Sequence, residues 1–248
     1  MVKNVWGFMV ITQHLCAACG SEHIRRNGSS QGHAKYHCTA CGHQARFVPA
    51  AAGRALRYAQ VEQLLVERNS QRSIVRVRGV SRMTVAKLIK KALAARPPLP
   101  RLRPKKAQRR EWEALELDEM WTFVARKKRK VWLWLAIERA SRRIVAWVTG
   151  RRDAATARRL WQALPRRYQR HCWYFTDLFP AYVGALPRWH HRRCPKGTGG
   201  TNIVEAINCS LRQRCGVLVR KSCSFSKSIC MHNARIKIVI DNYNVTLN

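Results

Sequence analysis

The chain has 248 residues, of which 48 are basic and 13 acidic, giving a formal net charge of +35. This charge favours a polyanionic partner, and nucleic acid is the most obvious one. The hydrophobic content of 46% excludes a disordered basic tail, and the length suits one medium domain with small modules. A ribosomal or nucleoid protein would carry a similar charge, so composition defines the partner class rather than the role.

The N-terminal region shows no targeting signal. Residues 5–15 are apolar, but no small-residue cleavage site follows them, and the longest later apolar run, residues 131–137, is far too short to span a bilayer. We therefore expect no membrane partner and a location in the cytoplasm of a prokaryote, in association with the nucleoid.

Four of the ten cysteines lie close to the N-terminus. Cys16, Cys19, Cys38 and Cys41 form two CxxC pairs with 18 residues between them, a spacing that can close a tetrahedral thiolate site and favours zinc. A redox dithiol and a decayed site are the alternatives. Some nearby histidines are alternative ligands, although four cysteines already complete a site: His14, His23, His33, His37 and His43. We predict a zinc ribbon in residues 1–50, and buried reduced thiols for the other six cysteines.

Residues 55–96 predict an all-α helix-turn-helix module. The apolar residues of its first two helices are Val61, Leu64, Leu65, Ile74, Val75 and Val77. Gly79 permits a tight turn, and Ser81 caps a third helix over residues 82–93. The polar face of this helix suits the major groove of DNA, and its candidate contacts are Arg82, Thr84, Lys87, Lys90 and Lys91. The alternative is a plain three-helix core with a solvated basic face.

Residues 97–112 form a basic linker rich in proline. Proline opposes a helix, and the segment has little to bury. It could lie along DNA phosphates or remain a solvated loop.

Residues 113–248 predict an α/β domain. Apolar strand patterns cover residues 115–121, 131–137, 144–148 and 172–176. Asp153 caps a helix over residues 154–164, residues 179–186 suit a helix and residues 188–191 a last strand. Residues 201–214 form a final helix with Ile203, Ile207 and Leu211 in one stripe. This order is that of a ribonuclease H-like fold.

Three scarce carboxylates lie at positions suited to catalysis in such a domain. Asp118 lies on the first strand, Asp177 ends the fourth, and Glu205 lies on the final helix away from its apolar stripe. Asp241 lies near a C-terminus that we expect to fray. Three converging carboxylates repel one another unless divalent cations neutralise them, and two Mg²⁺ or Mn²⁺ ions would activate a water or a 3′-hydroxyl. The alternative for each acid is a surface ion pair with an arginine.

Two further side chains share the helix face of Glu205. Arg212 lies two turns after Glu205, and Asn208 lies between them. Either could hold a DNA phosphate beside the metal ions, although Arg212 could equally be a solvated arginine.

Several segments resemble the insertion-sequence-1 (IS1) family of transposases. Residues 117–121 (LDEMW), 175–177 (FTD) with Pro180 and Tyr182, and 201–205 (TNIVE) look like the three acidic motifs of that family. The most specific similarity is residues 208–213 (NCSLRQ), followed by 220–221 (RK) and 224–228 (SFSKS). The order of zinc ribbon, helix-turn-helix and catalytic domain also fits, so the resemblance covers nearly the whole chain.

The resemblance implies a DDE transposase, a polynucleotidyl transferase with a two-metal mechanism. Such an enzyme binds the terminal repeats of its own insertion sequence and cuts and joins double-stranded DNA at the element ends and the target. Asp118, Asp177 and Glu205 would hold magnesium, with Arg212 beside them, and Asn208 and Lys227 would contact DNA. A homodimer or higher oligomer would pair the two ends.

The chain also departs from the family pattern. Ala206 and Ile207 follow Glu205 where the family usually has basic or aromatic residues. The alternative function is therefore a catalytically inactive, zinc-containing DNA-binding regulator derived from a transposase.

Overall fold

The computed structural model describes residues 13–94, 112–195, 197–221 and 223–247, which fall into two compact units, Met1–Ala59 and Gln60–Asn248. The boundary between the units lies within helix α1 (Ala50–Leu65). The predicted linker, apart from Trp112, and residues 1–12 lie outside the described residues. Among the described helices, none combines the length and the apolar character that crossing a membrane requires.

The first unit contains a three-stranded antiparallel sheet, built from β1 (Ile24–Ser30), β2 (His33–Cys38) and β3 (Gln44–Arg46). Gln31 and Gly32 connect the first two strands with φ angles of 52° and 76°, as a tight primed hairpin turn requires. The core consists of Cys16, Tyr36 and Cys38 with a few partly buried neighbours. A core this small needs a covalent or metal cross-link for stability.

The second unit begins with the end of α1, followed by α2 (Gln71–Arg78) and α3 (Arg82–Ala94). The predicted turn is confirmed: Gly79 has a φ of 62°, and the Ser81 hydroxyl accepts a hydrogen bond from the Thr84 amide at 3.1 Å. Val77 lies in α2, as predicted, but it is 62% exposed. Helix α2 has little more than two turns and buries Ile74, so its buried stripe is narrow. Helix α3 packs against both α2 and α7 (Ile229–Val245).

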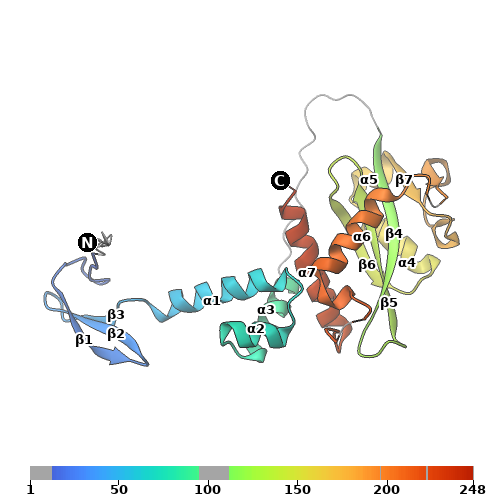
Figure 1. Ribbon diagram of the computed structural model, residues 1–248. Helices are drawn as coiled ribbons and strands as arrows, with labels where there is room; N and C mark the ends of the chain where they lie inside the picture. The colour runs from blue at the N-terminus through green and yellow to red at the C-terminus, as the bar shows by residue number, and fades with distance from the viewer. Residues whose placement is uncertain (1–12, 95–111, 196, 222, 248) are drawn as a thin grey trace, which may run out of the picture. The chain divides into compact units, whose positions relative to one another are not determined.

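A five-stranded mixed sheet follows, with the strand order β6-β5-β4-β7-β8 (Figure 1). Its strands are β4 (Glu113–Phe123), β5 (Lys130–Glu138), β6 (Ile144–Gly150), β7 (Cys172–Thr176) and β8 (His191–Arg193). The first three strands pair in antiparallel fashion, whereas β7 and β8 add in parallel to β4. The central strand β4 therefore has the antiparallel hairpins on one side and the parallel strands on the other.

The predicted strands agree with the observed ones except near the end of the sheet. Residues 179–186 form only a short 3₁₀ turn, η1 (Pro180–Tyr182), instead of a helix. The last predicted strand begins later, because η2 (Arg188–His190) precedes β8. Proline at each turn start disfavours a longer regular element.

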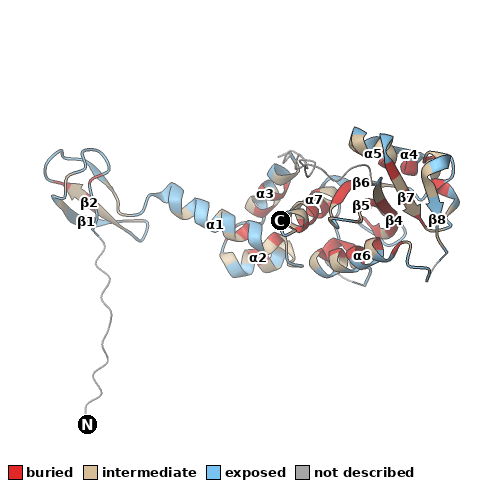
Figure 2. Cartoon of the chain, turned by 90° about the horizontal axis from the view of Figure 1, so that it is seen from above, coloured by how far each residue is buried: buried red, intermediate tan, exposed pale blue. Residues whose placement is uncertain are grey.

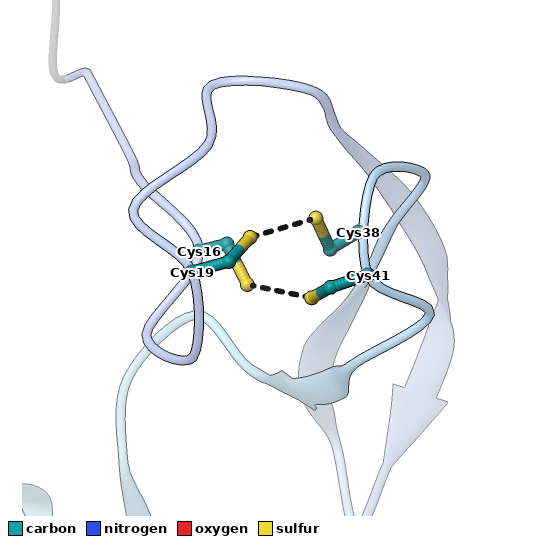
Figure 3. Close-up of side chains that lie close together, drawn as sticks. All are labelled: Cys16, Cys19, Cys38 and Cys41. Atoms are coloured by element: carbon teal, nitrogen blue, oxygen red, sulfur yellow. Dashed lines mark hydrogen bonds between the residues drawn. The ribbon is translucent and has the colours of Figure 1, made fainter.

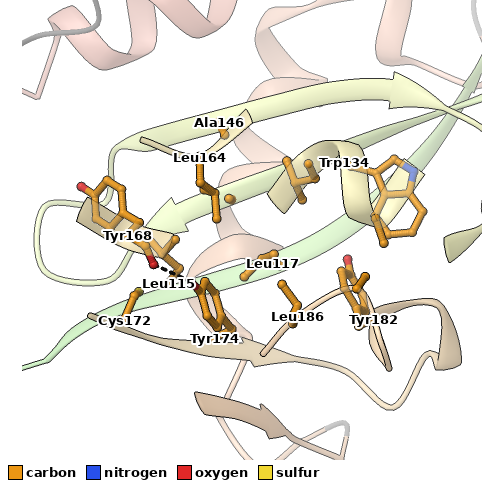
Figure 4. Packing of buried hydrophobic residues seen from close by; sticks show 14 of the residues in the cluster. Leu115, Leu117, Trp134, Ala146, Leu164, Tyr168, Cys172, Tyr174, Tyr182 and Leu186 are labelled. Atoms are coloured by element: carbon orange, nitrogen blue, oxygen red, sulfur yellow. Dashed lines mark hydrogen bonds between the residues drawn. The ribbon is translucent and has the colours of Figure 1, made fainter. Parts of the chain in front are cut away.

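Helices cover both faces of this sheet. Leu115, Leu117 and Trp134 pack against α4 (Ala154–Ala163) and α5 (Arg166–Arg170) on one face (Figure 4). On the other face Met120 and Leu133 pack against α6 (Asn202–Arg214), η3 (Gly216–Leu218) and α7. Figure 2 shows the buried residues concentrated in this sheet and its helices, whereas β1 is largely exposed.

The C-terminal segment is ordered, contrary to the expectation of fraying. Asp241 lies within α7 and forms an ion pair with Lys237 at 2.5 Å. The sequence did not predict this helix, because its many β-branched and asparagine residues are weak helix formers. Burial of its apolar residues against the sheet and η3 stabilises it instead.

The expectation for the remaining cysteines is only partly correct. Cys172 and Cys215 are buried, whereas Cys209, Cys223 and Cys230 are exposed. Cys209 lies on the side of α6 that faces away from the sheet, where a residue need not be apolar or buried. Asp153, in contrast, caps α4 as predicted, accepting a hydrogen bond from the Thr156 amide at 2.8 Å.

Candidate functional site

One face of β4 is tied to α6 by side-chain hydrogen bonds. Glu116 accepts a bond from the Val204 amide at 2.9 Å, and two residues further along the strand Asp118 accepts one from the Asn208 amide group at 2.6 Å. Two strand residues span about 6.8 Å, and four helix residues span about 6.0 Å. The two spacings nearly match, so alternate residues of β4 meet successive turns of α6.

Asp118 lies in a strongly anionic environment. Burial, and after it the neighbouring charges of Glu119, Asp177 and Glu205, together raise the pKa of Asp118 to about 7. Asp177 follows the end of β7 and accepts a hydrogen bond from the Phe179 amide at 2.9 Å. Glu205 is exposed in the first turn of α6 and accepts one from the Thr201 hydroxyl at 3.1 Å. Both acids therefore lie within electrostatic range of Asp118.

The three carboxylates do not form a closed ligand set. In the described parts of the chain, the group with three or more candidate ligand atoms within 4.8 Å of one another is the cysteine quartet of the first unit. The carboxyl oxygens of Asp118, Asp177 and Glu205 are therefore spread more widely than that. Mutual repulsion of unneutralised carboxylates favours such a separation.

Two buried glutamates on β4 were missed by the sequence analysis. Glu116 is 1% exposed and pairs with Arg139 at 2.8 Å, and Arg139 also donates to the carbonyl of Gly200 at 2.6 Å. These contacts, with the Val204 bond, attach the beginning of α6 to β4. The Glu116–Arg139 ion pair therefore helps to hold the segment that carries Glu205 in place.

The second buried glutamate, Glu119, contacts the segment that follows Asp177. Glu119 is 7% exposed, pairs with Arg152 at 2.9 Å and accepts a hydrogen bond from the Tyr182 hydroxyl at 2.8 Å. Burial raises the pKa of Tyr182 well above its usual range, so the phenol remains a donor. The bond attaches the turn after Asp177 to β4. The sequence signal that could have revealed both glutamates is the presence of charged residues within an apolar strand, since buried charges need partners.

Basic side chains lie next to this anionic cluster. Arg212 has its Nε atom buried without a hydrogen-bond partner among the described residues, and burial lowers its pKa, as does the nearby Arg220, whereas Asp118 raises it. A cavity of about 340 Å³ is lined by four basic residues, Arg68, Arg212, Arg220 and Lys221. Arg220 stacks 4.9 Å from the ring centroid of Trp121. These side chains therefore place positive charge near Asp118.

The other predicted DNA contacts lie in different surroundings. Asn208 is 5% exposed, and its amide group is engaged by Asp118. On α3, Thr84 is half-buried and bonded to Ser81. The remaining candidates are exposed: Arg82, Lys87, Lys90, Lys91 and Lys227.

The four predicted metal ligands of the first unit converge. The sulfurs of Cys16 and Cys41 lie 3.7 Å apart, as do those of Cys19 and Cys38 (Figure 3). Sulfurs placed 2.3 Å from a tetrahedral zinc ion lie about 3.8 Å from one another. The four cysteines therefore could hold one metal ion, and none of the histidines in the described residues belongs to the group.

The thiols of this cluster differ in acidity. Burial opposes ionisation of Cys16, but amide hydrogen bonds from Ala18 and Cys19 lower its pKa to about 6. At Cys41 a hydrogen bond from the His43 amide also lowers the pKa, yet interactions with the neighbouring sulfurs outweigh it and raise the pKa to about 12. Ionisation of one thiol therefore disfavours ionisation of its neighbours, and a bound cation would relieve the repulsion between the thiolates.

Comparison with known proteins identifies the protein class of the mixed-sheet region of the second unit. A family model described as IS1 transposase matches residues 113–245, a region that contains the whole five-stranded sheet with α4, α5, α6 and α7. The mixed-sheet region is therefore a transposase domain.

Curated relatives agree with the family model. Protein InsB of insertion element IS1 4 from Escherichia coli (strain K12) is 35% identical over 143 residues, which cover 55% of this chain and 83% of the relative. Protein InsB of insertion element IS1 from Shigella flexneri is 38% identical over 118 residues, covering 48% of this chain and 86% of the relative. The chain belongs to the IS1 transposase family, and these relatives support a transposase role.

Proposed function

We propose that the chain is a DDE transposase with a ribonuclease H-like catalytic domain. The strand order β6-β5-β4-β7-β8, with three antiparallel strands followed by two parallel ones, supports this fold. The observation that carries the function is the position of Asp118 on β4, where it is bonded to Asn208 of the helix that bears Glu205 and lies within electrostatic range of Asp177 and Glu205. These acids come from a strand, a strand end and a helix, and their joint effect on one group indicates a common site.

The acids fit a pair of divalent cations. Oxygen donors suit Mg²⁺ or Mn²⁺. Burial and the neighbouring acids raise the pKa of Asp118, so a bound cation would stabilise its charged form. We assign Asp118, Asp177 and Glu205 as the residues that would hold the ions. When bound, the ions would activate a water or 3′-hydroxyl and stabilise the leaving oxygen.

The chain supplies the remaining elements of the reaction. Asn208 orients the Asp118 carboxylate through its hydrogen bond, and Glu116 and Glu119 hold the segments that bear the other two acids. Arg212, with the basic cavity beside it, would bind the phosphate next to the scissile bond. Asn208, Glu116 and Glu119 would therefore position the carboxylates, whereas Arg212 would bind DNA.

The other modules would bring the element ends to this site. The cysteine quartet would hold structural zinc in place of the missing core of the first unit. Helix α3 would read the major groove of the terminal repeat through Thr84, Lys87, Lys90 and Lys91, and Arg82 and Lys227 would contact the DNA backbone. The partners are double-stranded DNA at the element ends and the target, and a dimer or higher oligomer would pair the ends at the bacterial nucleoid.

Strand transfer by purified protein tests this function. The substrate is a labelled duplex carrying the terminal repeat that flanks the gene, incubated with target DNA with and without Mg²⁺. We expect magnesium-dependent joining, and its reduction by more than about 100-fold in Asp177→Asn, since even outer-shell partners of a metal contribute 10–100-fold. DNA binding should persist, because the substitution removes a negative charge near phosphate.

A matched acid serves as the control. Asp153→Asn also neutralises a carboxylate of the same unit, but Asn is a good helix cap, so strand transfer should stay close to the wild-type level. Joining by Asp177→Asn at the wild-type rate would refute the assignment. Binding without any joining by the wild-type protein would instead identify an inactive DNA-binding regulator.

A further inference from the structure

A second basic cavity lies apart from the carboxylates. It has a volume of about 550 Å³ and is lined by the beginnings of α2, α3 and α7 and by residues 223–228. Four of its lining residues are basic: Arg72, Arg82, Lys227 and Arg235. None of the residues lining it in the described chain is acidic. Its surroundings therefore favour an anion.

Two helix N-termini border this cavity. Ser70 caps α2 and accepts a hydrogen bond from the Ser73 amide at 3.0 Å, and Ser228 caps α7 in the same way through the Met231 amide at 3.3 Å. Each cap satisfies one of the first amides of its helix and leaves others for a ligand. The positive ends of two helix dipoles add to the basic side chains.

A buried arginine with an unfilled donor supplies the independent evidence. Arg235 lines the cavity yet is only 4% exposed. Its Nη2 atom donates to the carbonyl of Asn69 at 3.1 Å, but its Nη1 atom is buried without a hydrogen-bond partner among the described residues. A guanidinium keeps its charge in proteins, and a buried charge without a counter-charge is costly. An anion in the cavity would supply the missing counter-charge.

The walls of the cavity are held in place by backbone contacts. The Ala125 amide donates to the carbonyl of Ser226 at 2.8 Å, and the Arg68 amide donates to the carbonyl of Arg214 at 2.7 Å. Gly216 permits this packing, since a Cβ atom there would lie 3.3 Å from the Cβ atom of Ser224. The cavity is therefore formed before any ligand binds, which lowers the entropic cost of binding.

We propose that this cavity binds a phosphate group of the DNA backbone. The helix-turn-helix contributes Arg72 and Arg82, and the segment around the start of α7 contributes Lys227 and Arg235. One phosphate would thus be held by two parts of the unit that are far apart in sequence. The chemistry required is that of a phosphate oxyanion, and the choice of DNA as its source rests on the proposed function.

The test compares two double variants of the full-length protein. Replacing the buried Arg235 would also remove its contact with Asn69, so the cavity variant is Arg72→Ala with Lys227→Ala, both at exposed positions. The control is Arg158→Ala with Arg166→Ala, which removes the same charge from exposed positions on α4 and α5, on the other face of the sheet.

The first measurement uses inorganic phosphate alone. Thermal unfolding is followed with and without 20 mM phosphate, at a constant ionic strength maintained with chloride. A Kd near 1 mM would raise the Tm of the wild type by about 4–7 °C. We expect the control variant to keep this increase and the cavity variant to lose it. No increase in the wild type, or equal increases in both variants, would overturn the proposal.

The second measurement identifies the source of the phosphate. Binding to a 30-base-pair duplex of arbitrary sequence is measured by fluorescence anisotropy between 50 and 200 mM salt. Loss of one phosphate contact lowers the slope of log K against log salt by about 0.9, and we expect this in the cavity variant but not in the control. An unchanged slope together with a lost phosphate effect supports a phosphate site but overturns DNA as its occupant. Neither measurement requires strand transfer, so the result stands apart from the test of the proposed function.

Discussion

The buried histidine His232 should make the second unit sensitive to acid. Its side chain is 0% exposed on α7, and neither ring nitrogen has a hydrogen-bond partner among the described residues. Burial lowers the pKa of His232 from its ordinary value of 6.5 to about 4. Below pH 6.5 this histidine is protonated in the unfolded chain but stays neutral in the folded chain. The free energy of unfolding is therefore unaffected above pH 6.5 and decreases as the pH falls towards 4.

The size of this effect follows from the two pKa values. The full loss of folding free energy, reached below pH 4, is about 3 kcal/mol at about 1.4 kcal/mol for each pH unit. At pH 5.0 the loss is about 2 kcal/mol, or about 4–8 °C in Tm for a unit of this size. In His232→Leu a side chain of similar volume cannot titrate and has no polar atom to satisfy. We expect this variant to be at least as stable as the wild type at pH 7.5.

Urea unfolding followed by tryptophan fluorescence measures the difference. The free energy of unfolding is determined at pH 7.5 and pH 5.0 for the wild type and for His232→Leu. Titrating carboxylates affect both proteins equally, so they cancel when the two pH differences are subtracted. The variant should lose about 2 kcal/mol less than the wild type between these pH values. An equal loss in both proteins would show that His232 is not the acid-sensitive group.

Two further predictions concern the DNA-binding modules. Cys38→Ser should abolish the binding of one zinc ion per chain, which metal analysis measures. It should also unfold the first unit, because that unit has almost no other core, while the circular dichroism of the second unit persists. Zinc retained at full stoichiometry would contradict this prediction. Lys87→Ala with Lys90→Ala should weaken binding to element ends and lower the salt slope by about 2, since each exposed lysine neutralises about one phosphate. An unchanged slope would mean that α3 does not contact DNA.

The sequence predicted those features that depend on neighbouring residues. The cap at Asp153, the turn at Gly79 and the strand over Cys172–Thr176 each follow from a local pattern, and the structure contains all three. The CxxC spacing likewise brings the two cysteines of each pair together in a short turn, and the pairing of β1 with β2 then joins the two pairs. Local chemistry was sufficient in these cases.

Features that depend on tertiary contacts could not be predicted. Glu116 and Glu119 are buried because Arg139 and Arg152 reach them from other elements, and no periodicity in the sequence links these partners. Helix α7 forms because the sheet, η3 and α3 pack against it, although its own residues are poor helix formers. The cavity around Arg235 requires segments separated by most of the chain.

The packing of α3 against α7 has a geometric consequence for DNA. The helix proposed to read the terminal repeat belongs to the same compact unit as Asp118, Asp177 and Glu205. The number of base pairs between the recognised bases and the cut would then be set by the protein. Inserting about 5 base pairs between them would rotate the scissile phosphate by half a helical turn, to the opposite side of the duplex. An element end altered in this way would remain bound but would present the wrong strand to the carboxylates.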